Sequence, residues 1–223
     1  MVIAIDGPGG VGKSTVARAV AGRLGLAYLD TGATYRAATL VVLEAGVSPD
    51  DADAAVAVVD QAEFGYSMGT MYVEGRDVAR EVRSAEVTAN SSTVSAHPAI
   101  RERIVAFQRL WVAVHGNHAV VEGRDIGTAV FPEADAKIFL TARPGIRAAR
   151  RAGDPEAGGK DLETIAAELD ARDEADSTRA TSPLQPATDA VIIDTSDLAI
   201  DEVVVSVLAV VTERTGRQTT DAD

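Results

Sequence analysis

Residues 7–14 read Gly-Pro-Gly-Gly-Val-Gly-Lys-Ser, and this stretch decides the fold. It matches the pattern G-x-x-x-x-G-K-[ST] without a mismatch. Glycines let backbone N–H groups curl around a phosphate, and the following helix N-terminus adds a favourable dipole. Lys13 supplies a positive charge for the β and γ phosphates, and the Ser14 hydroxyl is a suitable ligand for Mg²⁺. The predicted ATP-binding residues are Gly7, Pro8, Gly9, Gly10, Val11, Gly12, Lys13, Ser14 and Thr15.

The residues on either side of this loop predict a strand and a helix. Residues 2–6 form an apolar run that stops at the glycines, as in a strand buried on both faces of a parallel sheet. From Ser14 the apolar residues follow a helical period, and Gly25 is placed to end the helix. Similar short runs recur at 26–29, 119–121, 137–140 and 190–193. The sequence therefore predicts an α/β fold with five parallel strands joined by right-handed crossovers.

Two regions interrupt this alternation within a single domain, 1–223. Residues 47–97 contain a predicted acidic helix at 50–59 and a predicted hairpin at 64–73 that turns near Gly69, so we interpret them as an insertion. Residues 152–182 are glycine-rich and then helical and charged, with little apolar material, and we interpret them as a mobile lid. The polar tail, 215–223, is expected to be flexible.

The composition excludes several classes of function. The chain has 34 acidic and 21 basic residues and a net charge of −13, which opposes binding to nucleic acids or anionic membranes. An anionic substrate therefore needs a locally basic site. The absence of cysteine excludes disulfides, thiolate catalysis and cysteine-bound metal. No apolar run spans a bilayer and no signal peptide is recognisable, so we expect a cytoplasmic protein.

Two further segments place acids and arginines where predicted strands end. Asp30 to Arg36 follow the second strand, although Asp30 or Thr31 could simply cap a helix. Arg124 and Asp125 follow residues 120–122, although a surface ion pair is the simpler interpretation of that stretch alone.

Glu122, at the end of the same strand, could hold the water shell of Mg²⁺ or orient Arg124. An ordinary ion pair is a close alternative for this residue.

Five motifs together resemble one known family. GPGGVGKST, DTGATYR, STVSAHPAIRERIVAFQR, EGRDIGTAVFP and RDEADSTRATSPL occur in this order, within a likeness that runs from residue 2 to about 211, and resemble the bacterial cytidylate kinases of the nucleoside monophosphate kinase group. The resemblance implies a P-loop kinase fold with an NMP-binding insertion and a lid. It implies transfer of the γ-phosphoryl group of ATP to CMP or dCMP with Mg²⁺, by a monomer that takes small nucleotides as partners.

The resemblance also implies roles for individual residues. Residues expected at the acceptor phosphate are Thr31, Arg36 and Arg124. Residues expected to recognise cytosine are Ser92, Arg109 and Asp125. Residues expected at the ribose and phosphates are Arg172, Asp176 and Arg179. Residues expected to face the donor phosphates are Arg147, Arg150 and Arg151. The catalytic set is then Lys13, Arg124, Arg147, Arg151 and Arg179.

The chemistry of these side chains supports such roles. Cytosine donates through its N4 amine, which suits the Asp125 carboxylate, and accepts at O2 and N3, which suits an arginine and a hydroxyl. Arginine forks neutralise moving phosphate oxygens bidentately.

Two alternatives remain open at this point. One is a P-loop kinase specific for UMP or AMP. The other is a nucleotide-dependent switch, against which stands the lack of an N-K-x-D-like motif. Thr34 departs from the family, which usually has an apolar residue at this position. The segment 153–160 is shorter than the corresponding segment in many relatives. Trp111 is interpreted as core, and His115 and His118 as part of a polar loop.

Overall fold

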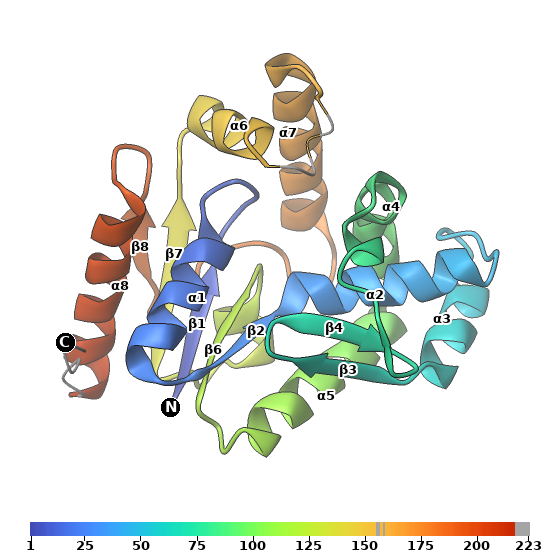
Figure 1. Ribbon diagram of the computed structural model, residues 1–223, viewed down its shortest axis with the longest axis horizontal. Helices are drawn as coiled ribbons and strands as arrows, with labels where there is room; N and C mark the ends of the chain where they lie inside the picture. The colour runs from blue at the N-terminus through green and yellow to red at the C-terminus, as the bar shows by residue number, and fades with distance from the viewer. Residues whose placement is uncertain (155–156, 158, 217–223) are drawn as a thin grey trace. The chain divides into compact units, whose positions relative to one another are not determined.

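A five-stranded parallel sheet organises the fold. In the computed structural model, which describes residues 1–154, 157 and 159–216, the strand order is β2-β6-β1-β7-β8 (Figure 1). The strands are β1 (Val2–Asp6), β2 (Ala27–Asp30), β6 (Ala119–Gly123), β7 (Ala136–Thr141) and β8 (Val191–Asp194). The five predicted strands are thus confirmed. Asp6 lies opposite Gly123 and Phe139, so the carboxyl ends of β6, β1 and β7 meet at one edge.

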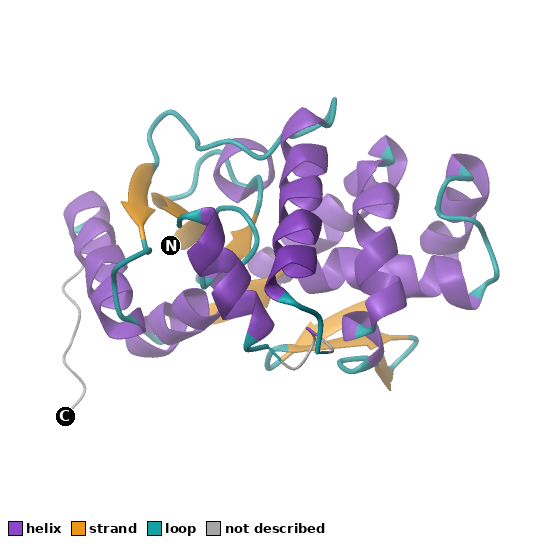
Figure 2. Ribbon diagram, turned by 90° about the horizontal axis from the view of Figure 1, so that it is seen from above, coloured by secondary structure: helices purple, strands orange, loops and turns teal. Residues whose placement is uncertain are grey.

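The helices that accompany this sheet are α1 (Lys13–Leu24), the short π-helical turn η2 (Ile126–Val130), α6 (Pro144–Ala152), α7 (Leu162–Thr178) and α8 (Ile200–Thr215) (Figures 1 and 2). α1 ends at Gly25, which adopts the left-handed conformation predicted for a C-cap. α1 and α8 pack together against β1 and β7, and Ile5, Val16 and Val207 are fully buried in this core. Full burial of such side chains contributes about 1.5–3 kcal/mol each.

α6 and α7 share a small apolar cluster of their own. Ile165 and Leu169 on α7 are buried with Ala148 and Ala157. The sequence prediction that 152–182 has little apolar material to anchor it is therefore wrong for α7, because two residues four apart form a single buried stripe.

The chain divides into two compact units, and each is described separately. One contains residues 1–28 and the described residues from 115 onward, and the other is Leu29–Val114. The predicted insertion at 47–97 lies inside the second unit, and the predicted lid at 152–182 inside the first. Residues 155, 156, 158 and 217–223, which include most of the predicted tail at 215–223, lie outside the described residues. The insertion, the lid and the tail as functional parts stay predictions.

The second unit contains α2 (Thr31–Glu44), α3 (Ala52–Gln61), β3 (Phe64–Ser67), β4 (Thr70–Val73), β5 (Arg76–Asp77), the 3₁₀ turn η1 (Glu81–Arg83), α4 (Ala85–Ala96) and α5 (Pro98–Val114). The hairpin predicted at 64–73 is confirmed as β3 and β4, and β5 adds an unforeseen third strand. Asp30 caps α2, as the simpler interpretation of that segment proposed, because its side chain accepts a hydrogen bond from Ala33 N.

Trp111 joins α5 to the hairpin. Its indole Nε1 donates to Tyr66 O at 2.7 Å, and the two rings meet edge to face with centroids 5.6 Å apart. Trp111 is buried, as are Ile100 and Ile104 on the same helix. The prediction that Trp111 is a core residue is confirmed.

Thr34, the departure from the family pattern, belongs to a buried polar chain. Gln108 Nε2 donates to Thr34 Oγ1 at 2.8 Å, and Thr34 Oγ1 donates to Thr31 O at 2.7 Å. Both side chains are fully buried. A hydroxyl is accommodated there because it is hydrogen-bonded on both sides.

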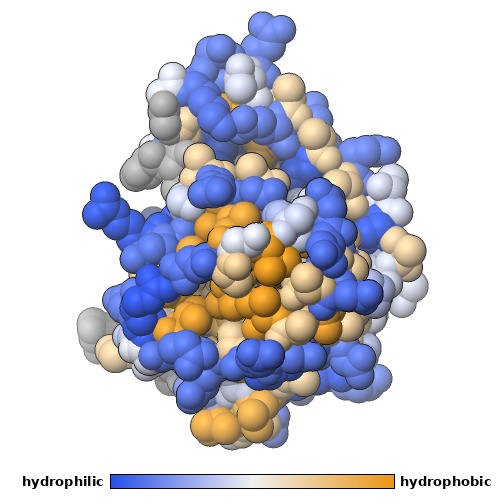
Figure 3. Space-filling model, turned by 90° about the vertical axis from the view of Figure 1, so that its right-hand side faces the viewer, coloured by the Kyte–Doolittle hydropathy of each residue, from blue (hydrophilic) through white to orange (hydrophobic). Residues whose placement is uncertain are grey.

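α3 is amphipathic. Ala55 and Val59 are buried, whereas Asp53 and Asp60 are exposed. Figure 3 faces the side of the molecule on which α3 lies, and apolar residues gather at the centre of that face within a rim of hydrophilic ones. Because Asp53 and Asp60 are exposed, these acids of α3 contribute to the negative charge of the surface.

Candidate active site

Three glycines of the phosphate-binding loop adopt backbone conformations that other residues rarely adopt. Gly7, Gly10 and Gly12 have φ values of 146°, 76° and 90°. A Cβ on Gly7 would lie 2.2 Å from Leu140 O, and a Cβ on Gly10 would lie 2.8 Å from Arg147 O. The loop is therefore in close backbone contact with β7 on one side and α6 on the other.

Lys13 begins α1 directly after this loop. Its ammonium group is buried and donates to Pro8 O at 2.6 Å. Burial, together with the charges of Arg124 and Arg172, lowers the pKa of Lys13 to about 7, and the charges of Glu122 and Asp6 oppose the shift. The protonation of Lys13 therefore depends on the charged groups around it.

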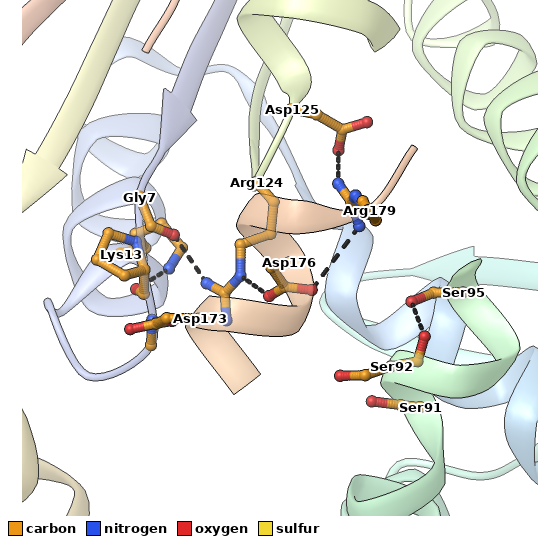
Figure 4. A network of polar contacts seen from close by, with 12 residues as sticks. Gly7, Lys13, Ser91, Ser92, Ser95, Arg124, Asp125, Asp173, Asp176 and Arg179 are labelled. Atoms are coloured by element: carbon orange, nitrogen blue, oxygen red, sulfur yellow. Dashed lines mark hydrogen bonds and ion pairs between the residues drawn. The ribbon is translucent and has the colours of Figure 1, made fainter. Parts of the chain in front are cut away.

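Arg124 connects the loop to α7. It follows β6, donates from Nη1 to Gly7 O at 2.8 Å, and donates from Nε to Asp176 Oδ2 at 2.8 Å (Figure 4). Arg179 lies 3.8 Å from Asp176 Oδ1 and 3.5 Å from Asp125 Oδ1. Four predicted site residues, Arg124, Asp125, Asp176 and Arg179, therefore form one ion-pair network with the loop. The simpler alternative, a local surface pair between Arg124 and Asp125, is not what the structure shows.

Asp176 is held ionised by its neighbours in this network. Burial raises the pKa of Asp176, but the charges of Arg124, Arg172 and Arg179 outweigh it, so the pKa is lowered overall. Arg172 was predicted for the same site, and its charge reaches both Asp176 and Lys13.

Asp6 is a site residue that sequence reasoning missed. Its carboxylate accepts hydrogen bonds from Ile126 N and Gly127 N at 2.8 Å each, and it is buried. Burial raises the pKa of Asp6 to about 6, although these two bonds oppose the shift. Asp6 thus fixes the turn that carries Arg124 and Asp125. Its position directly before Gly7 was the available signal.

Arg147 on α6 reaches the loop directly. It is buried and donates from Nη1 to Gly9 O at 3.3 Å and to Asp173 Oδ2. Its Nη2 donates to Asp170 at 3.3 Å. Gly9 N donates in turn to Asp173 Oδ1 at 3.3 Å. Arg147 therefore lies at the loop, as predicted for a residue near the donor phosphates.

The other two arginines of α6 have different surroundings. Arg150 donates to Thr195 Oγ1 at 2.8 Å and to Thr195 O at 2.6 Å, and the Thr195 hydroxyl lies 3.2 Å from Val11 O. Arg151 donates to Asp154 at 3.2 Å. Arg150 thus contacts the loop through Thr195.

Glu122 and Ser14 are the candidate metal residues. Glu122 is buried and accepts a hydrogen bond from the Tyr28 hydroxyl, and its charge is felt at Lys13. Ser14 and Thr15 are exposed at the start of α1. Among the described residues, no group of three or more His, Cys, Asp or Glu could hold a metal ion. His118 Nδ1 lies 2.7 Å from Gly116 O, within its own loop.

The remaining predicted residues belong to the 29–114 unit. Thr31 is buried, Arg36 pairs with Asp30 at 3.0 Å, and Ser92 O accepts from the Ser95 hydroxyl at 3.1 Å. Arg109, in contrast, is exposed on α5.

Arg101, which lies on the same helix as Arg109, was missed by sequence reasoning. It is buried, donates to Ser95 O at 3.3 Å and lies over the Tyr35 ring at 5.2 Å. A buried arginine near the serines of α4 is better suited than Arg109 to recognise a base. Its position two turns earlier than Arg109 on the same helix was the only sequence signal.

The fold and this site define a P-loop kinase, because a glycine loop and its lysine follow the central strand of a parallel sheet and arginines converge on the loop. Among solved structures, an uncharacterized protein from Eubacterium ventriosum has a TM-score of 0.53 at 13% identity and covers 96% of this chain and 99% of its own. A sugar kinase from Janibacter has a TM-score of 0.50 at 11% identity, covering 96% and 95%. At this identity they support the fold alone.

Sequence comparison identifies the family within the P-loop kinases to which this chain belongs. The cytidylate kinase family model matches residues 3–213. Cytidylate kinases from Rhodococcus opacus and Streptomyces avermitilis are each 49% identical, over 97% and 96% of this chain and 96% and 94% of their own lengths. One from Mycobacterium leprae is 48% identical over 97% of both chains. This chain belongs to the cytidylate kinase family and is a phosphotransferase. No helix in the described part of the chain is long and apolar enough to cross a membrane.

Proposed function

We propose that this chain transfers the γ-phosphoryl group of ATP to CMP or dCMP and releases ADP with CDP or dCDP. The observation that carries the proposal is the family match over residues 3–213, which includes the glycine loop and every arginine of the network described above. The acceptor phosphate is already anionic, so the residues need to position it and neutralise charge rather than remove a proton.

The donor site in this proposal is the loop from Gly7 to Thr15. Its backbone N–H groups and Lys13 would bind the phosphates, and Arg147 would neutralise charge on the transferred group. Mg²⁺ would be held by the Ser14 hydroxyl and phosphate oxygens, with Glu122 acting through water. These are hard oxygen donors, which suit Mg²⁺. When bound, Mg²⁺ supplies neutralising charge to the phosphate oxygens.

The acceptor site in this proposal is made by the residues that the family resemblance assigns to CMP. Arg36 and Arg124 would hold the acceptor phosphate near Thr31, and Asp125 would accept from cytosine N4. Arg172, Asp176 and Arg179 would serve the ribose and phosphates, and Arg150 and Arg151 the donor side. Ser92 with Arg101, in preference to the exposed Arg109, would complete base recognition. The monomeric state and the cytoplasmic location stay predictions.

The test is a coupled assay for ADP with CMP, dCMP, UMP and AMP as acceptors. We expect turnover with CMP or dCMP at least tenfold more efficient than with UMP or AMP, because a carboxylate that reads an amine rejects the carbonyl of uracil. Preference for UMP or AMP would assign another monophosphate kinase. Slow ATP hydrolysis with no transfer would favour a switch protein.

Asp125→Asn is the variant that tests the base contact. It should raise the KM for CMP by about tenfold while the KM for ATP changes little, since about 1.4 kcal/mol corresponds to a factor of ten. Asp189→Asn removes an exposed partner of Lys137 and is the matched control. Equal loss of affinity for both nucleotides would contradict the role of Asp125.

A further inference from the structure

A carboxylate of the protein itself lies on the phosphate-binding loop. Gly9 N donates to Asp173 Oδ1 at 3.3 Å, and Arg147 donates to Asp173 Oδ2. Arg147 Nη1 also donates to Gly9 O at 3.3 Å. Asp173 therefore engages one amide of the loop and the arginine that reaches the loop, and these are the two kinds of group that bind a phosphate.

Apolar contact holds α7 at the same point. A Cβ on Gly9 would lie 2.8 Å from Leu169 Cδ2, so Leu169 packs directly against the loop one helical turn before Asp173. Leu169 is buried in the cluster that α6 and α7 share. The carboxylate is thus positioned by the packing of its helix as well as by its hydrogen bonds.

We propose that Asp173 is an internal competitor for the donor nucleotide. Its carboxylate takes the Gly9 N–H and the charge of Arg147, and a phosphate of ATP or ADP must displace it to reach both groups. The proposal rests on the donor site assigned above. A competing contact raises the apparent dissociation constant by a factor of one over the fraction of molecules in which the contact is open.

Asp170 provides a matched control on the same helix. It accepts from Arg147 Nη2 at 3.3 Å, and its side chain is 64% exposed. Among the described residues, no hydrogen bond or ion pair joins Asp170 to the loop. Removing the charge of Asp170 alters the surroundings of Arg147 by the same single charge, but leaves the Gly9 contact in place.

The experiment is calorimetric titration of the full chain with ADP and with ATP, without an acceptor, for wild type, Asp173→Asn, Asp173→Ala and Asp170→Asn. If the contact forms in about four molecules of five, loss of the carboxylate tightens binding about fivefold. We expect this for both Asp173 variants, and a change of less than twofold for Asp170→Asn. The alanine variant is included because an asparagine oxygen can still accept from Gly9 N.

Two results would overturn the proposal. Unchanged or weaker binding in the Asp173 variants would mean that the carboxylate does not compete, and equal tightening in Asp170→Asn would assign the effect to charge alone. Circular dichroism melts identify any variant that fails to fold, and the remaining Asp173 variant then decides. The titrations need no turnover, so they are independent of whether CMP is the acceptor.

Discussion

Lys13 is expected to take up a proton when a nucleotide binds. Its pKa is lowered to about 7, so at pH 8 most molecules carry it neutral, and an anionic phosphate favours the charged form. Binding of ADP at pH 8 should therefore consume about one proton, and affinity should fall up to about tenfold per pH unit above 7. Titration in buffers of different ionisation enthalpy measures the uptake.

Lys137→Met is the control, because Lys137 pairs with Asp189, whose side chain is 54% exposed, and the change should leave the uptake unchanged. Binding without proton linkage at pH 8 would show that Lys13 is already charged before the nucleotide arrives.

Asp6 gives a second dependence on pH, in the stability of the fold. Its pKa is about 6 in the folded chain against 3.8 ordinarily, so the folded state binds the proton more tightly. The contribution is present below about pH 4 and is lost as pH rises through 6. The advantage of wild type over Asp6→Asn in unfolding free energy should fall by about 2 kcal/mol between pH 4.5 and 7. Urea denaturation at both pH values measures this, and a difference that is independent of pH would contradict it.

The residues that sequence reasoning found and those it missed differ in how far along the chain their partners lie. The glycine loop and Lys13 are contiguous, so one motif specifies them. Asp6 acts on Ile126, 120 positions away, and Gly9 meets Asp173 at a separation of 164. Their roles depend on which strands are neighbours, and an isolated acid carries no signal of its distant partner. Arg101 was missed because burial on a helix depends on what packs against it.

At the scale of elements, Trp111 tests how α5 supports the hairpin. Trp111→Phe removes the buried hydrogen bond to Tyr66 O, which should lower the unfolding free energy by about 2 kcal/mol. Leu110→Ala changes the neighbouring residue, which is 64% exposed, and should stay within about 0.5 kcal/mol. Trp111 is the single tryptophan, so denaturation is followed by circular dichroism. Equal effects of the two changes would refute the assigned role.

The elements predicted correctly from the sequence are those marked by a recognisable pattern of apolar residues. All five strands of the parallel sheet are short apolar runs, and α1 has both its period and its terminal glycine. β5 has two residues, both charged, and no pattern of that length can predict a strand. α7 was read as poorly anchored because Ile165 and Leu169 are isolated among charged residues.

At the scale of the whole molecule, a net charge of −13 does not exclude a cluster of arginines at the loop, because aspartates pair with those arginines. Arg124 and Arg179 are paired with Asp125 and Asp176, and Arg147 with Asp170 and Asp173. The cations are buried at modest cost before a nucleotide arrives, since each has a counter-charge. Composition alone predicted that a basic site was needed, but not that acids would share it.

The short strand β5 has a consequence for how the protein behaves at high concentration. A sheet edge offers unpaired N–H and C=O groups to which a strand of another molecule can add. One edge of the three-stranded sheet is only Arg76–Asp77, both exposed, and Arg76 donates to Glu44 and lies 3.8 Å from Glu81. Charge and brevity leave little backbone for another chain to pair with, so this edge is protected against aggregation.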